Sequence, residues 1–386
     1  MPQIKPEIET FARIKVVGVG GSGGSAISRM MSSGIKGVDF IAINTDVQAL
    51  HNNRAQHKIH IGKVLTKGTG AGMNPEIGRK AAEENKEEIL QALRGADMVF
   101  ITCGLGGGTG SGASPIIAEL AKEAGALSVA VVTKPFTFEG TQRARIAEDA
   151  LIDLKQKIDT IIVIPNDRLL NIIDKKVSLL NAFGIVDDVL RQAVQGISDL
   201  IIYPGVINLD FADVKAIMEN SGPAIMGIGR AIGENRAVIA AKAAINSPLL
   251  EFSIEGAKGI LFNVTGGSDL GMIEISEAAK VITESADRDT KVIFGAVIDE
   301  KTKKGEIKIT VIATGFDGEA RHGQNNHQLI LESEVVKNSL LETEKKKSKR
   351  EKEEKKEKNN ITVYKSPLAD ESDDEWDTPA FLRKKK

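Results

Sequence analysis

The sequence is short of several features that would point to particular classes of protein. A single cysteine, Cys103, excludes an internal disulfide and suits a reducing compartment. The chain also has no run of about 18 apolar residues, the length that could span a membrane. Neither sign of charge dominates, since 51 Lys and Arg balance 53 Asp and Glu. We therefore expect no nucleic-acid partner and no acidic substrate on the ground of global charge.

The opening residues and the bulk composition indicate a compartment and a size class. Residues 1–18 lack the apolar core of a signal peptide, so we expect a cytoplasmic protein without direct membrane insertion. The 386 residues are 41% hydrophobic, which is enough for a sizeable core and more than one domain. The 38 glycines show no collagen-like period and gather in clusters instead.

From Ile14 to about Gly315, short β-branched runs alternate with helical patterns, which is typical of an α/β fold. The first five runs are apolar almost throughout, as expected of parallel strands buried on both faces. These runs are 14–20, 40–45, 98–104, 128–134 and 160–166. We predict a doubly wound, mostly parallel domain with helical segments between its strands. One of these helical segments runs from Asn74 to Gly95.

The rest of the chain predicts a long central helix, a smaller domain and a tail. A helical stretch near 178–205 precedes a smaller α+β domain at 223–317, whose sheet we expect to be mixed or antiparallel, with a hairpin turn at 301–306. Residues 318–373 include a run of charges of both signs, which predicts a disordered linker. An isolated helix with Glu–Lys pairs is the alternative. The apolar side chains within 374–386 favour a docking peptide.

The first glycine cluster, Gly18 to Ser25, follows a strand and opens a helix. Glycine there allows a tight turn and a close approach of backbone N–H groups to a phosphate, which the helix N-terminus also attracts. Residues 18–23 match GxGxxG, so this cluster alone leaves a dinucleotide-dependent dehydrogenase open. A glycine-rich turn that binds nothing is also open.

A second cluster, Gly104 to Gly112, also follows a strand, and we expect a helix after it, beginning near Ala113 with Pro115 in its first turn. Two such loops at one sheet edge can hold a polyphosphate from two sides, whereas a dehydrogenase needs only one. The chain has no GxxxxGK[ST] motif. Phosphate charge would therefore be met mainly by backbone dipoles and a metal ion.

GGGTGSG at 106–112 is the signature loop of the tubulin/FtsZ family, and the chain resembles the bacterial-division branch of that family over about residues 13–316. Other matching segments are IKVVGVGGSGGSAISRM, IAINTDVQAL, TKGTGAGMNPEIGRKAAEE, KPFTFEG, IPNDRLL and NLDFADV. The resemblance implies a GTP-hydrolysing protein that polymerises head to tail into protofilaments and forms the cytokinetic Z ring at mid-cell. A tubulin-like filament protein for DNA partitioning is the alternative, against which the ending of the chain argues.

The resemblance also implies which residues bind GTP and GDP. The first loop would contact the nucleotide, the signature loop would bind the α- and β-phosphates, and 71–73 would lie at the γ-phosphate. The loop residues concerned are Gly20, Gly21, Ser22, Gly24, Ser25, Ala71, Gly72, Met73, Gly107, Gly108, Thr109 and Gly110. Glu139 and Arg143 would meet the ribose and its surroundings.

Four further residues would bind the guanine and the sugar, namely Asn44, Asn166, Phe183 and Asp187. A carboxylate at 187 suits guanine because the N1–H and N2–H₂ groups of the base are both donors. Phe183 would stack on the base. On residue type alone, a solvated helix residue is the alternative for Asp187, and an ordinary core residue is the alternative for Phe183.

Asp210 precedes a helix with an apolar face and is a natural N-cap, with Asp213 three residues on, so capping alone could explain both. In the family this segment inserts against the nucleotide of the neighbouring subunit. The resemblance therefore implies that Asn208, Asp210 and Asp213 hydrolyse that nucleotide, the carboxylates polarising the attacking water. Mg²⁺ is the implied companion ion, K⁺ is a further candidate, and no metal ligands are assigned.

The predicted organisation is an N-terminal extension (1–12), a GTP-binding domain (13–177), the central helix (178–205), the catalytic loop and following helix (206–222), a C-terminal domain (223–317), the linker (318–373) and the terminal peptide (374–386).

DTPAFLRKKK resembles the family's C-terminal peptide, which docks onto membrane-tethering and regulatory division proteins. On a flexible tether, a filament would multiply such weak contacts by avidity. The residues implied in docking are Trp376, Pro379, Phe381, Leu382 and Arg383.

Overall fold

One continuous sheet organises the described part of the chain. The computed structural model describes residues 12–170, 179–202, 207, 210–247, 253–299, 302–303 and 305–316. Ten strands in these ranges form a sheet in the order β3-β2-β1-β4-β5-β6-β7-β10-β8-β9. Strands β1 to β6 are all parallel to their neighbours, which confirms the doubly wound first domain.

The first domain consists of six strands and the helices that connect them. The strands are β1 (Ile14–Val19), β2 (Val38–Asn44), β3 (His57–His60), β4 (Met98–Gly104), β5 (Leu127–Lys134) and β6 (Thr160–Pro165). The helices are α1 (Gly20–Ser32), α2 (Val47–His51), α3 (Lys63–Thr66), α4 (Pro75–Glu84), α5 (Lys86–Leu93), α6 (Gly108–Glu123), the 3-10 helix η1 (Thr137–Glu139), α7 (Thr141–Lys157) and α8 (Asn166–Leu170). Because the strands are parallel, their loops to the following helices all open at the same carboxyl edge.

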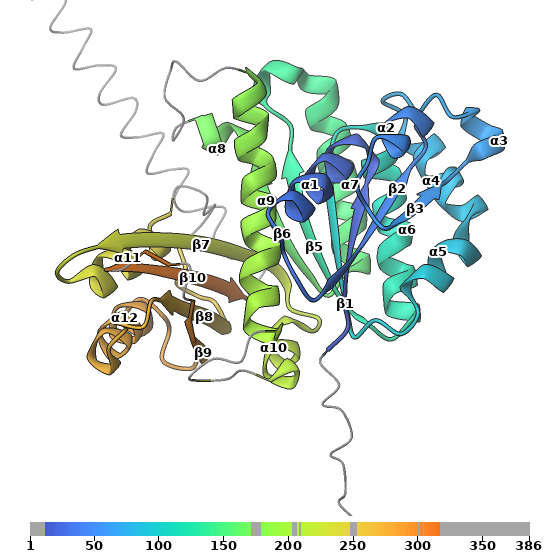
Figure 1. Ribbon diagram of the computed structural model, residues 1–386. Coiled ribbons are helices and arrows are strands. Elements are labelled where there is room, and N and C mark those ends of the chain that lie inside the picture. The colour runs from blue at the N-terminus through green and yellow to red at the C-terminus, as the bar shows by residue number, and fades with distance from the viewer. Residues whose placement is uncertain are drawn as a thin grey trace, which may run out of the picture. The chain divides into compact units, whose positions relative to one another are not determined.

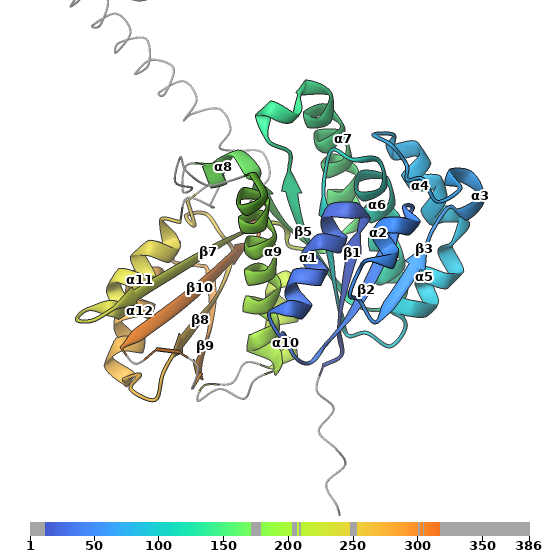
Figure 2. The same ribbon diagram turned by 45° about the horizontal axis from the view of Figure 1, so that its top comes forward.

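Helices cover both faces of the parallel sheet, and α9 (Leu179–Ile202) lies beside α1 in both views (Figures 1 and 2). The alternation of side chains along β1 explains the two layers. Val16 belongs to a core that includes buried residues of α1 and α9, whereas Val17 belongs to a core built with α4 to α7. The parallel strands are therefore apolar on both faces, as their sequence pattern predicts.

The second domain is a mixed sheet with helices on both of its faces. Its elements are α10 (Phe211–Met218), β7 (Gly222–Ile232), α11 (Arg236–Ile245), β8 (Gly259–Gly266), α12 (Met272–Glu284), β9 (Lys291–Ile298) and β10 (Glu306–Thr314). One face packs on α11 and α12, and the other packs on α9 and α10. The hairpin turn expected at 301–306 is wrong, because β8 lies between β9 and β10 in the sheet.

Two helix boundaries also differ from the sequence-based expectation. α6 begins at Gly108, not near Ala113, so Pro115 lies inside the helix. The helical segment expected from Asn74 to Gly95 is divided into α4 and α5 at Asn85. The Asn85 side chain accepts a hydrogen bond from the Gly62 backbone N–H at 3.0 Å. Asn85 thus links this break to the loop before α3.

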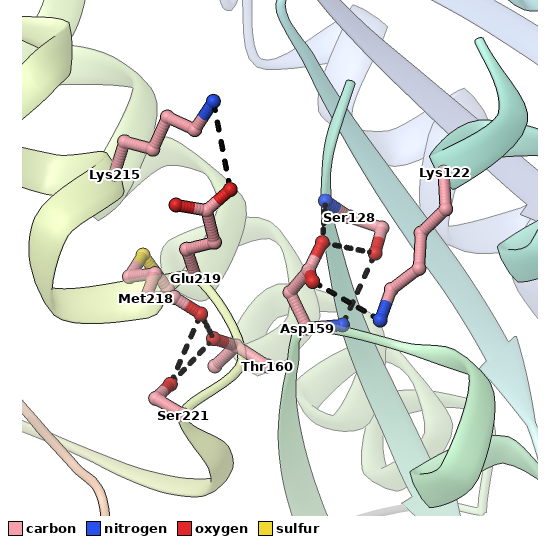
Figure 3. Close-up of polar contacts among 8 residues, drawn as sticks. All are labelled: Lys122, Ser128, Asp159, Thr160, Lys215, Met218, Glu219 and Ser221. Atoms are coloured by element: carbon pink, nitrogen blue, oxygen red, sulfur yellow. Dashed lines mark hydrogen bonds and ion pairs between the residues drawn. The ribbon is translucent and has the colours of Figure 1, made fainter. Parts of the chain in front are cut away.

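A buried polar cluster fastens the start of β6 to its surroundings (Figure 3). Asp159 accepts hydrogen bonds from the backbone N–H and the hydroxyl of Ser128, at 2.9 and 2.7 Å. The other carboxylate oxygen of Asp159 lies 3.1 Å from Lys122 Nζ. The Thr160 hydroxyl donates to the Met218 carbonyl at the end of α10. These contacts lie beside the short stretch, residues 160–162, through which β6 pairs with β7 and so joins the two domains.

Asp159→Asn is expected to lower the free energy of unfolding by about 2 kcal/mol at neutral pH, because charge-assisted contacts are lost. Burial raises the pKa of Asp159, but the Ser128 hydrogen bonds and the Lys122 ammonium together outweigh burial and hold the pKa below its ordinary value. The stabilisation is therefore present above the unfolded-state pKa of about 3.9 and lost as pH falls through the folded-state pKa. Urea unfolding of both proteins from about pH 7 to about pH 3 measures it. A difference that stayed constant throughout would contradict the prediction.

No helix within the described ranges is long and apolar enough to cross a membrane. Several predicted site residues fall outside the described residues. They are Asn208 in the catalytic segment and Trp376, Pro379, Phe381, Leu382 and Arg383 in the terminal peptide.

Candidate functional site

The two glycine loops meet at the carboxyl edge of the parallel sheet. β1 and β4 are neighbours, with Val19 opposite Cys103, so α1 and α6 begin side by side. Gly20 has a φ of +73°, and a Cβ there would lie 3.1 Å from the Gly110 backbone nitrogen, which suits glycine alone. The adjoining helix N-termini offer backbone N–H groups and partial positive charge to a single anion.

The segment predicted to lie at the γ-phosphate packs against the second loop. A Cβ on Gly108 would come 2.9 Å from the Ala71 Cβ. Ala71 is buried, whereas Gly72 and Met73 are exposed, and Gly107 is half-buried at the N-cap of α6. The structure therefore brings the 71–73 segment to the same edge as the signature loop, with two of its three residues accessible.

Hydroxyl groups join the two loops to their neighbours. The buried hydroxyl of Thr109 lies 2.7 Å from that of Thr45, which directly follows β2. Ser22 lies over the end of β4, where a Cβ on Gly104 would come 2.8 Å from the Ser22 Oγ. These contacts place β1, β2 and β4 around one site.

A pocket of about 650 Å³ opens beside the first loop. A volume of this size suits a small organic ligand. Six of the predicted binding residues line it, namely Gly20, Gly21, Gly24, Ser25, Asn44 and Asp187. The pocket thus extends from the glycines at the start of α1 to an acidic residue of α9.

Asp187 is the acidic residue in the lining of this pocket. Its side chain is 16% exposed, and its Oδ2 lies 3.6 Å from Arg29 Nε. Burial raises the pKa of Asp187 to about 6, while the positive charge of Arg29 acts in the opposite direction. At neutral pH the carboxylate is therefore largely ionised and can accept hydrogen bonds from donor groups of a ligand.

The other residues predicted to bind the base and the ribose lie outside the pocket lining. Asn166 begins α8 and is buried, and its Oδ1 has no hydrogen-bond partner among the described residues. Phe183 is 41% exposed and contacts Phe136 edge to face, with ring centroids 5.7 Å apart. Glu139 and Arg143 form an ion pair with each other. The Asn166 oxygen is thus buried with no partner among the described residues, whereas the Phe183 ring is accessible to a ligand.

Asp210 and Asp213 lie at the opposite edge of the sheet from the pocket. Asp210 is the N-cap of α10, as predicted, and accepts a hydrogen bond from the Asp213 backbone N–H at 2.8 Å. Ile202, at the end of α9, packs against Gly37 just before β2 begins. From Asp187 to Ile202, α9 rises by about 20 Å at 1.5 Å per residue. Figure 1 shows α10 beside the C-terminal end of α9, at the opposite end from α8. The α10 carboxylates therefore cannot reach a ligand in the pocket of their own subunit.

Several polar residues in the pocket lining were not predicted from the sequence. Ser28, Arg29 and Ser32 of α1 and Arg54 before β3 all line it. A helical spacing does connect Gly21, Ser25, Ser28, Arg29 and Ser32, because steps of three and four residues place them on one face of α1. This polar face lies opposite the buried residues Ala26, Ile27 and Met30. It is the sequence pattern from which these pocket residues could have been predicted.

Among the described residues, no group of three or more His, Cys, Asp or Glu side chains could hold a metal ion. A divalent cation accompanying a nucleoside triphosphate would therefore take most of its ligands from phosphate oxygens and water, as Mg²⁺ commonly does. The backbone-lined loops fit this arrangement, since they supply donors to phosphate and no competing carboxylate.

Comparison with known proteins decides between the families that the glycine loops allow. The model of the Tubulin/FtsZ family GTPase domain matches residues 13–174, and that of the FtsZ family C-terminal domain matches residues 222–317. The empty FtsZ dimer of M. jannaschii is 48% identical, with a TM-score of 0.76, and the match covers 80% of this chain and 89% of that one.

Two other solved structures extend the comparison. A mutant of M. jannaschii FtsZ is also 48% identical with a TM-score of 0.76, covering 79% of this chain and 92% of its own. CetZ2 from Haloferax volcanii, in a GTPγS-bound protofilament, is 22% identical with a TM-score of 0.68, covering 85% of this chain and 99% of its own. At that identity the likeness shows the fold alone. The family models and the 48% identity together exclude the dehydrogenase alternative, and the chain belongs to the FtsZ family of the tubulin/FtsZ GTPases.

Proposed function

We propose that this protein is a cytoskeletal GTPase that assembles head to tail into protofilaments and forms the cytokinetic ring at mid-cell in bacterial division. The observation that supports this best is the separation between the pocket and the α10 carboxylates. Asp187 lines the pocket at one sheet edge, while Asp210 is exposed at the other. Head-to-tail stacking would place the α10 end of each subunit against the pocket of the next subunit. The related structures include an FtsZ dimer and a CetZ2 protofilament.

In this proposal the carboxyl edge of the sheet holds GTP. The adjoining N-termini of α1 and α6 bind the α- and β-phosphates, and the accessible Gly72 and Met73 lie at the γ-phosphate. Glu139 and Arg143 contact the ribose, and Phe183 stacks on the base. The side-chain oxygens of Asn166 and Asp187 accept hydrogen bonds from the guanine N–H groups. Asn44 supports the sugar and shapes the loop, since its Oδ1 accepts from the Thr45 backbone N–H at 2.9 Å.

Hydrolysis in this proposal needs the neighbouring subunit. Asp210 and Asp213 of one subunit orient and polarise a water molecule against the γ-phosphate held by the next, and Asn208 helps to fix that geometry. A bound Mg²⁺ ion would neutralise developing phosphate charge. Because a free monomer holds nucleotide without the groups that attack it, turnover depends on assembly.

GTP hydrolysis per subunit should therefore vanish below a threshold protein concentration. The measurement is phosphate release across a dilution series, with light scattering to follow assembly on the same samples. The rate per subunit and the scattering are expected to fall together at one concentration. A rate per subunit that stayed constant to high dilution would show that each monomer hydrolyses alone, and the shared site would be wrong.

We also propose that the terminal peptide docks onto membrane-tethering and regulatory division proteins, through Trp376, Pro379, Phe381, Leu382 and Arg383. Its support is the apolar cluster at the end of a highly charged stretch. Deleting 377–386 should abolish capture of such adaptors and leave GTP turnover intact. Loss of turnover in the truncated protein would contradict this separation of roles.

A further inference from the structure

Arg29 extends from α1 across to α9 at the edge of the pocket. Its Nε lies 3.6 Å from Asp187 Oδ2, and a Cβ placed on Gly184 would come within 3.1 Å of its Nη2. The guanidinium therefore lies over bare α9 backbone, one turn before the carboxylate that it contacts. A Cβ at position 184 would crowd the guanidinium.

The charges around Asp187 make Arg29 its principal partner. Asp188, the next residue of α9, forms its own ion pair with Arg191 at 2.7 Å. Arg54 lines the same pocket, and its Nη1 donates to Ser32 Oγ at 2.6 Å. Burial raises the pKa of Asp187, and Arg29 is the cation that counteracts it.

We propose that Arg29 is a positioning residue that fixes the ionised Asp187 carboxylate toward the purine and thereby sets the preference for guanine over adenine. The inference rests on the proposed function of the site. The Watson–Crick edge of guanine offers two neighbouring donors, N1–H and N2–H₂, which a carboxylate accepts. Adenine presents an acceptor at N1, which a carboxylate repels and a protonated carboxyl group can satisfy. The charge state of Asp187 therefore decides between the bases.

The test is equilibrium binding of GDP and ADP to the full chain by calorimetry, since neither nucleotide is consumed. In the wild type, the preference for GDP should fall as pH drops through about 6, the pKa of Asp187. Arg29→Met removes the charge, so the midpoint of this loss should rise by about one pH unit or more. GDP binding should then be roughly fivefold weaker than wild type near pH 6, and the gap should close toward about pH 8.5.

Arg29→Lys keeps the charge and should leave the midpoint near that of the wild type. Arg145→Met is the matched control, because Arg145 is 86% exposed on α7. Arg29→Gln replaces the Met variant if thermal unfolding shows that the latter does not fold.

The outcomes separate this inference from the proposal on which it rests. If Arg29→Met weakened GDP binding and ADP binding equally at every pH, the inference would be overturned, because Arg29 would then act on the parts that the two nucleotides share. The same midpoint shift in Arg29→Lys and Arg29→Met would also overturn it, since charge would not be the cause. A wild-type protein with no preference for GDP over ADP would instead contradict the proposed function.

Discussion

Asp210→Asn is expected to reduce GTP hydrolysis by at least about 100-fold, the scale of losing a group that orients and polarises an attacking nucleophile. The amide oxygen of Asn can still accept the Asp213 N–H hydrogen bond, so the N-cap of α10 is kept. Nucleotide affinity should not change, because α10 and the pocket lie at opposite edges of the sheet. The measurement pairs steady-state phosphate release with GDP binding.

Two controls make this experiment specific. Glu219→Gln removes a carboxylate just after the other end of α10, where it pairs with Lys215 at 3.6 Å, and should hydrolyse GTP normally. Mixing Asp210→Asn with Asp187→Ala should restore activity, since the first variant contributes a bound nucleotide and the second the carboxylates. A mixture as inactive as its components would speak against a site shared between subunits.

Gly112→Ala is expected to lower the free energy of unfolding by about 3 kcal/mol or more, by overpacking a site that cannot relax. A Cβ at this position of α6 would lie 1.9 Å from the Pro75 carbonyl oxygen and 2.7 Å from the Arg79 backbone nitrogen. Both atoms belong to the backbone of α4, so no side chain can rotate away. Moving α4 would also displace the 71–73 segment, and nucleotide binding should weaken with stability.

Gly107→Ala is the matched control for stability, because a Cβ there meets nothing within 4 Å. Thermal unfolding of the nucleotide-free proteins should place it close to the wild type and Gly112→Ala several degrees lower. Equal midpoints for the two variants would show that α4 and α6 do not need this close contact.

The sequence indicates the glycine loops clearly but misplaces the helix that follows the second one. Glycine costs about 1 kcal/mol in a helix interior relative to alanine, so propensity favours a start for α6 after Gly112. In the fold α6 begins at Gly108, because the bare backbone at Gly112 allows α4 to pack directly upon it. Tertiary packing outweighs propensity there, and only the arrangement in space reveals it.

Side chains at the site differ in how far a sequence can predict them. The loop glycines and the N-cap role of Asp210 are local patterns, visible over a few residues. The role of Arg29 at the site depends on its contact with Asp187, which lies far along the chain on another helix, so no local pattern reveals it. The strand order of the second domain could not be predicted for the same reason. Strands β9 and β10 are consecutive in the sequence, and nothing in the segment that joins them shows that β8 separates them in the sheet.

The position of the pocket and the α10 carboxylates at opposite edges would give an assembled filament a direction. At one end the last subunit would leave its pocket open, so GDP could exchange for GTP. At the other end the carboxylates would be exposed with no nucleotide beneath them, and every subunit between would have its nucleotide covered by a neighbour. Renewal of spent nucleotide would then be confined to one tip, and growth and shrinkage at the two tips would differ in rate.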